Sequence, residues 1–125
     1  VNDTLAMNFV DHLYLDGTFG NEIENDLIES VPRYLLAYLA TLYGKSQSFT
    51  FDQIVEIANS SEPPIPESIF ARSLNLLKVT SVIREKSTHL YEFTVPDYPD
   101  ILNRLGESHL NSIEGNLKKF LKKVL

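Results

Sequence analysis

The side chains that could catalyse a reaction or bind a metal are few, and their spacing suits neither role. His12, His89 and His109 are widely separated, they fit neither HxxxH nor HExxH, and the chain has no cysteine. Zinc sites need such ligands at short spacings, so we expect no metal and no cofactor. No serine lies in G-x-S-x-G, and Asp97 and Asp100 are expected to cap a helix rather than to form an acid/base pair. We therefore expect no catalytic residue and no enzyme.

The segment from residue 66 to residue 78 carries side chains suited to reading nucleic acid. If its apolar residues turn inward, six polar side chains remain outside, namely Glu67, Ser68, Arg72, Ser73, Asn75 and Lys78. Arginine and asparagine match the edges of guanine and adenine, and serine hydroxyls can meet phosphates. Arg84 and Lys86 would add contacts to the DNA backbone.

The same face has a simpler interpretation. Glu67 lies at the expected helix N-terminus, where base-reading side chains usually concentrate, and its carboxylate would repel phosphate while favouring the helix dipole. DNA contact and an ordinary solvated or protein-contacting face both stay open, and the sequence favours the second.

Two apolar patterns are candidates for protein interaction. Leu117 and Leu121 form a heptad-like seam beside four lysines, and this seam could pack on the domain's first helix or pair with another subunit. The lysines fit an anionic partner or, more simply, the negative end of a helix dipole. Tyr34 and Tyr38 recur at helical spacing and are expected at the edge of the core; if exposed, they would form a docking face.

These side chains are positioned by a chain that is predicted to be mostly helical. Apolar periodicity predicts helices over 3–15, 25–43, 51–58, 66–77, 98–105 and 108–125, and period-two strands over 82–86 and 90–95. Thr50 and Gln53 have capping-box spacing, and Pro66 suits the first position of a helix. Pro32 either starts a second helix or kinks a continuous one, and Gly44 is a plausible helix end.

Four stretches carry a resemblance to a known family: SFTFDQI at 48–54, IPESIFARSLNLL at 65–77, VIR at 82–84 and LYEFTVP at 90–96. From about residue 32 to residue 105 the chain resembles the winged helix-turn-helix domain that follows the nucleotide-binding core of many AAA+ and STAND-type ATPases, including origin-recognition relatives. Ser81 stands where that family often has glycine, which matters if the turn needs a left-handed residue. The sequence holds no P-loop, so the ATPase activity that the family implies cannot reside in it.

The distribution of charge along the chain limits the kinds of partner that we expect. Residues 1–62 carry ten acidic and two basic side chains, a net charge of −8, whereas residues 63–125 carry seven acidic and nine basic ones, a net charge of +2. This balance argues against strong nonspecific binding to DNA or to anionic membranes. No apolar run approaches the length of a membrane span, no signal peptide is visible, and the chain starts at Val1 rather than Met. We expect an intracellular piece of a longer protein.

The expected fold is α+β and mostly α: a winged helix-turn-helix with an extra N-terminal helix and a long C-terminal helix. An N-terminal helical extension at 1–24 precedes a winged-helix core at 25–105, and a C-terminal helix at 106–125 packs on the same domain. The expected function is a non-catalytic interaction or regulatory module of a larger ATPase or regulator, which binds another protein, or the rest of its own chain, through its helical faces. Homo-oligomerisation through the C-terminal helix stays open, and the alternative function is DNA binding through the third helix and the wing.

Overall fold

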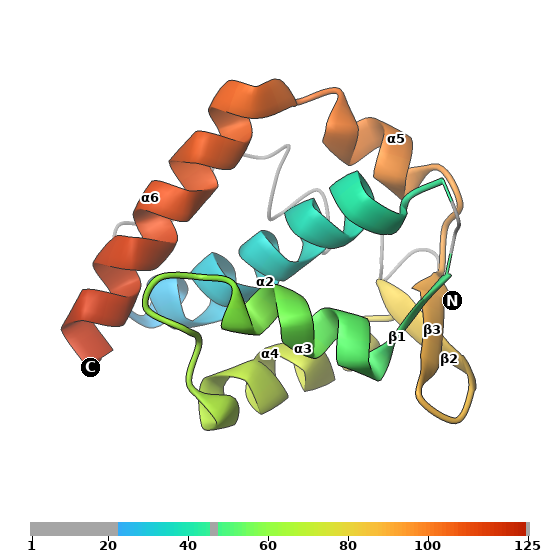
Figure 1. The fold of residues 1–125 in the computed structure, drawn as a ribbon, viewed down its shortest axis with the longest axis horizontal. Coiled ribbons are helices and arrows are strands. Elements are labelled where there is room, and N and C mark those ends of the chain that lie inside the picture. Colours follow the sequence, from blue (N-terminus) through green and yellow to red (C-terminus); the bar gives the residue numbers. More distant parts are fainter. Residues whose placement is uncertain (1–22, 46–47, 125) are drawn as a thin grey trace.

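One long helix runs through the middle of the molecule, with the other helices around it and a small sheet at one end (Figure 1). The computed structural model describes residues 23–45 and 48–124, with side chains described from Ser30 onward. The fold is α+β and mostly helical, as predicted. The predicted helix over 3–15, and nearly all of the predicted extension at 1–24, lie outside the described residues.

The central helix is α2, Ile23–Tyr43, and it contacts α3, α4, α5 and α6. Its core positions include Val31, Leu35 and Leu39, which have no exposed surface. Pro32 lies inside the helix, so the segment is one continuous helix rather than two. Because α2 is apolar around much of its circumference, it can serve as the core on which the rest packs.

The segment after α2 combines a short strand, β1 (Ser48–Thr50), with α3, Phe51–Asn59. The predicted capping box is confirmed: the Gln53 N–H donates to Thr50 Oγ1 at 3.2 Å, and the Thr50 N–H donates to Gln53 Oε1 at 2.8 Å. These bonds satisfy two backbone donors at the start of the helix, which fixes its first residue. The strand β1 was not predicted.

A proline-rich turn leads from α3 to α4, Glu67–Val79. The Ser61 hydroxyl lies 2.9 Å from the carbonyl oxygens of Ala58 and Pro63, which ties this turn to the end of α3. Pro66 was predicted to be the first residue of this helix, but the helix begins one residue later, at Glu67, and Pro66 precedes it. The turn places α4 beside both α3 and α2.

The sheet is antiparallel, with β3 (Leu90–Phe93) between β1 and β2 (Ile83–Ser87). Both strands of the predicted ribbon are therefore present, and β1 adds a third. Phe49 of β1 and Phe93 of β3 meet edge to face on the buried side, with ring centroids 5.4 Å apart. The Phe51 N–H also donates to the His89 carbonyl at 2.9 Å, which joins the start of α3 to the turn between β2 and β3.

The chain closes with α5, Tyr98–Asn103, and α6, Gly106–Val124, both of which pack on α2. Asn103 Nδ2 donates to the Ala40 carbonyl at 3.1 Å, which joins the end of α5 to α2. Asp97 precedes α5, but its side chain makes no capping hydrogen bond, so the predicted role of this carboxylate is wrong.

Gly44 ends α2 at a close approach to α5, and we predict that Gly44→Ala destabilises the fold. A Cβ at this position would lie 2.5 Å from the Ala40 carbonyl oxygen and 2.7 Å from Pro99 Cβ, and neither neighbour is a flexible side chain. The overpacking should lower the free energy of unfolding by about 1–3 kcal/mol in urea titrations. The matched control is Gly115→Ala in α6, where nothing lies within 4 Å and the variant should gain about 0.5–1 kcal/mol. Equal effects of the two substitutions would contradict the close approach.

Ser81, between α4 and β2, has a φ of 63°, so this turn does need the left-handed conformation that glycine adopts freely. Ser81→Gly should relieve the strain and raise the free energy of unfolding by about 0.5–1 kcal/mol, measured by urea titration. Ser87→Gly, in the exposed end of β2, is the control and should be destabilising, since glycine weakens a strand. A loss of stability in Ser81→Gly would show that the serine is not strained.

His109 in α6 should make stability depend on pH. Burial, and secondly the positive charge of Arg33, lower its pKa below the usual 6.5, so the unfolded chain binds the proton more readily than the folded one. The His109 contribution is therefore fully present above pH 6.5 and is lost as the pH falls from 6.5 through the lowered value. His109→Gln should show a smaller drop in the urea midpoint between pH 7.5 and pH 5 than the unsubstituted chain. Parallel pH profiles would count against this role.

Candidate functional site

The outer face of α4 carries most of the side chains that the sequence assigned to nucleic acid. Ser68, Arg72, Asn75 and Lys78 are all exposed there. Ser73 is not: only 4% of it is exposed, so its predicted place on the outer face is wrong. The helical period could have shown this, because position 73 falls on the inward stripe with residues 70, 74 and 77.

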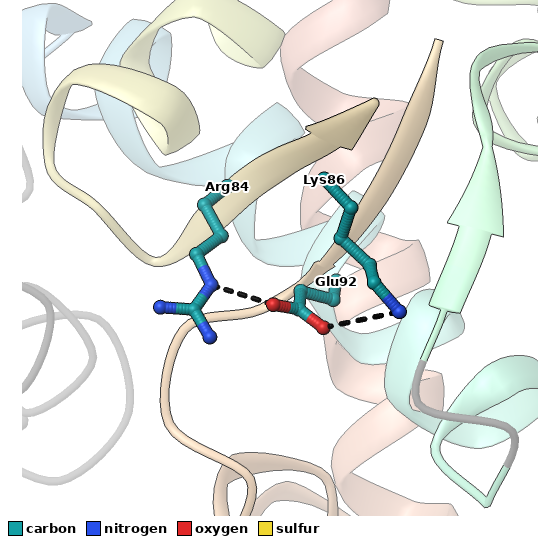
Figure 2. A network of polar contacts seen from close by, with 3 residues as sticks. All are labelled: Arg84, Lys86 and Glu92. Carbon is teal, nitrogen blue, oxygen red and sulfur yellow. Dashed lines mark hydrogen bonds and ion pairs between the residues drawn. The ribbon is translucent and has the colours of Figure 1, made fainter. Parts of the chain in front are cut away.

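Arg84 and Lys86, the predicted backbone-binding residues of the wing, are both held by one carboxylate (Figure 2). Arg84 Nε donates to Glu92 Oε2 at 2.6 Å, and Lys86 Nζ lies 3.6 Å from Glu92 Oε1. Arg84 and Glu92 are direct cross-strand partners in the β2–β3 register, and Lys86 follows two residues later on the same face. The sequence interpretation missed Glu92, although the alternation along the two strands places all three side chains on one side.

This pairing reduces the positive charge of the β2–β3 ribbon. The hydrogen bond from Arg84, together with the charges of Arg84 and Lys86, lowers the pKa of Glu92, so the carboxylate stays ionised at neutral pH. With Glu85 next to them, the charged side chains of β2 and β3 sum to zero. The β2–β3 ribbon therefore offers phosphates little net attraction.

An open groove of about 630 Å³ lies between α3 and α4, and we call it the α3/α4 groove. Its apolar lining comes from Phe51 and Val55 of α3, Ile65 of the turn, and Phe70, Ala71 and Leu74 of α4. The Phe51 and Phe70 rings meet edge to face with centroids 6.1 Å apart. The sequence interpretation did not find this groove, because it depends on how the two helices pack.

Four polar residues line the α3/α4 groove, namely Asn59, Glu67, Asn75 and Lys78. Lys78 Nζ is 5.9 Å from the centroid of the Tyr91 ring, a cation–π contact that places the ammonium beside the sheet. Glu67 lies at the opposite end of α4. The groove thus combines an apolar floor with opposite charges at its two ends.

The predicted protein-interaction residues are mostly inside the chain. Leu117 and Leu121 are 2% and 1% exposed, because α6 lays its apolar seam on α2. The seam therefore packs within the domain, on α2, and neither leucine is available to a second subunit. Tyr34 is 5% exposed, and its ring meets that of the half-buried Tyr38 in a tilted contact with centroids 4.8 Å apart, which places both at the core edge rather than on a docking face.

Within residues 23–45 and 48–124, no cluster of three or more His, Asp or Glu side chains could hold a metal ion. No helix in the same ranges is long and apolar enough to cross a bilayer. Comparison with protein-family models, with curated proteins and with solved structures found no match. The functional assignment therefore depends on the surfaces described above.

Proposed function

We propose that this chain is a non-catalytic winged-helix module that binds another protein through its helical faces. The observation that carries the proposal is the α3/α4 groove, an apolar and solvent-open surface on the two helices of the helix-turn-helix unit. Open grooves with an apolar lining and a few polar groups are typical binding sites.

The order of the elements supports the winged-helix part of the proposal. Helix α2, strand β1, helices α3 and α4, and the β2–β3 ribbon follow one another as they do in a winged helix-turn-helix, with β3 between β1 and β2. In this interpretation α4 is the recognition helix and the β2–β3 ribbon is the wing. The resemblance to the domain that follows the core of AAA+ and STAND-type ATPases makes a larger ATPase or regulator the expected context.

The charges favour a protein partner over DNA. Glu67 occupies the first turn of α4, where a winged helix would approach the bases. The Glu92 carboxylate already forms ion pairs with Arg84 and Lys86 of the proposed wing. Val79, at the other end of α4, is 63% exposed. An exposed apolar side chain suits contact with a protein better than contact with a charged phosphate backbone.

DNA binding is the second candidate, and one observation favours it. Ser68, Arg72 and Asn75 are all exposed on α4, where their side chains match phosphate, guanine and adenine. The two candidates make opposite predictions for a salt-dependent titration.

We expect no micromolar binding of a fluorescein-labelled mixed-sequence duplex at about 50 mM salt, where electrostatic attraction is strongest. Fluorescence anisotropy measures it, with a repeat at about 200 mM salt. The outcome that contradicts the proposal is binding that falls steeply with salt and that Arg72→Ala and Lys78→Ala both weaken. Arg104→Ala, an exposed arginine next to α5, is the control that separates a specific face from general charge.

A further inference from the structure

Four exposed lysines lie on the outer side of α6, and we call them the α6 lysine face: Lys118, Lys119, Lys122 and Lys123. Successive residues of a helix point about 100° apart, so these four positions fall within an arc of about 140°. The buried residues of α6 lie on the opposite side of the helix, which packs on α2 at one edge of the molecule (Figure 1). This packing fixes the rotation of α6, so the lysine face stays turned toward solvent.

The helix dipole accounts for only part of this face. Lys122 and Lys123 lie in the last turn of α6, where cations offset the partial negative charge of a helix C-terminus. Lys118 and Lys119 lie one turn earlier, and the dipole effect falls off within the last turn. Within the described residues, Lys118, Lys119 and Lys122 take part in no ion pair. Three ammonium groups therefore lack an acidic partner in the part of the chain that the structure describes.

Two acids lie next to one member of the face. Glu62 and Glu114 line a hollow of about 250 Å³ together with Lys118, and their charges offset that of Lys118 in part. Lys119 lies about 100° farther round the helix. The sequence of α6 contains no acid after Glu114. The positive charge of the α6 lysine face is therefore centred on Lys119 and Lys122.

The charge of the rest of the chain favours a short anionic partner. The whole chain has a formal net charge of −6 and the face carries four positive charges, so the remaining residues carry −10. The face rises only about 8 Å along α6, which is about one Debye length at physiological salt. A DNA duplex or an anionic membrane extends much farther and would be repelled by the acidic remainder, whereas a short acidic peptide segment contacts the face alone.

We infer that the α6 lysine face binds a short acidic segment of a partner protein, with aspartate or glutamate side chains opposite Lys119 and Lys122. The inference rests on the proposed protein-binding function and adds a second surface to the α3/α4 groove. Exposed ion pairs are individually weak, so this contact is sensitive to salt and adds to binding elsewhere on the module.

A fluorescein-labelled peptide of alternating glutamate and serine tests the inference on the whole chain. Fluorescence anisotropy should show binding at about 50 mM salt that weakens about fivefold at about 200 mM salt. The same peptide with glutamine in place of glutamate is the control and should not bind. No binding of the glutamate peptide at low salt, or equal binding of the two peptides, would overturn the inference.

Two double variants locate the contact. Lys119→Gln combined with Lys122→Gln should weaken binding of the glutamate peptide about fivefold at low salt. Lys45→Gln combined with Arg104→Gln is the matched control, because it removes the same charge from two exposed positions outside α6, and it should change binding by less than about twofold. Equal effects of the two double variants would show that binding follows net charge and would contradict a site on α6. Circular dichroism melts confirm that each variant is folded.

The outcomes separate this inference from the proposed function. Absence of peptide binding removes the α6 site and leaves the proposal for the α3/α4 groove standing. Binding of the duplex or of phosphatidylserine vesicles that the Lys119/Lys122 variant abolishes, without binding of the glutamate peptide, would assign the face to another class of anion and so refute the inference. Duplex binding that Arg72→Ala and Lys78→Ala weaken counts against the proposed function instead, because those two residues lie on α4. Peptide binding that only the Lys119/Lys122 variant weakens supports both.

Discussion

Burial of α2 is the constraint on which the rest of the structure depends. Leu35, Leu36 and Leu39 have no exposed surface, and consecutive positions of a helix point about 100° apart, so α2 is covered on more than one side. Each fully buried leucine contributes about 1.5–3 kcal/mol relative to an exposed one. The helices α3, α4, α5 and α6 all contact α2. The geometry of the α3/α4 groove is therefore set by how two helices pack on a third.

Charge is distributed unevenly over this framework. In the β2–β3 ribbon, the Glu92 carboxylate pairs with both Arg84 and Lys86, which leaves the ribbon nearly neutral. On α3, the exposed Asp52 and Glu56 form no ion pair with any of the residues that the structure describes. A domain that reads DNA with α4 and this ribbon would be expected to show the reverse arrangement, with free bases on the ribbon and few acids near α4. The distribution of charge, rather than the fold, distinguishes the two candidate functions.

Elements whose start or pairing is determined by neighbouring residues in the chain could be predicted from the sequence. The capping box of Thr50 and Gln53 fixes the start of α3 within four residues, and period-two alternation places the two ribbon strands. Features that depend on contacts between residues far apart in the chain could not be predicted. The strand β1 has three residues and exists because Phe49 pairs with Tyr91, forty-two positions away. The α3/α4 groove was not predicted for the same reason, since its lining combines residues from α3, the turn and α4.

The ring of Phe51 joins two surfaces that have been described separately. It lines the α3/α4 groove, and its centroid lies 5.5 Å from that of the His89 ring in the turn between β2 and β3. The backbone N–H of the same residue donates to the His89 carbonyl. A ligand that shifts this ring would therefore act on the β2–β3 turn as well, and a contact that holds the turn would act on the groove. Thermodynamic linkage makes such effects reciprocal, so the two surfaces would influence each other's affinity by the same factor.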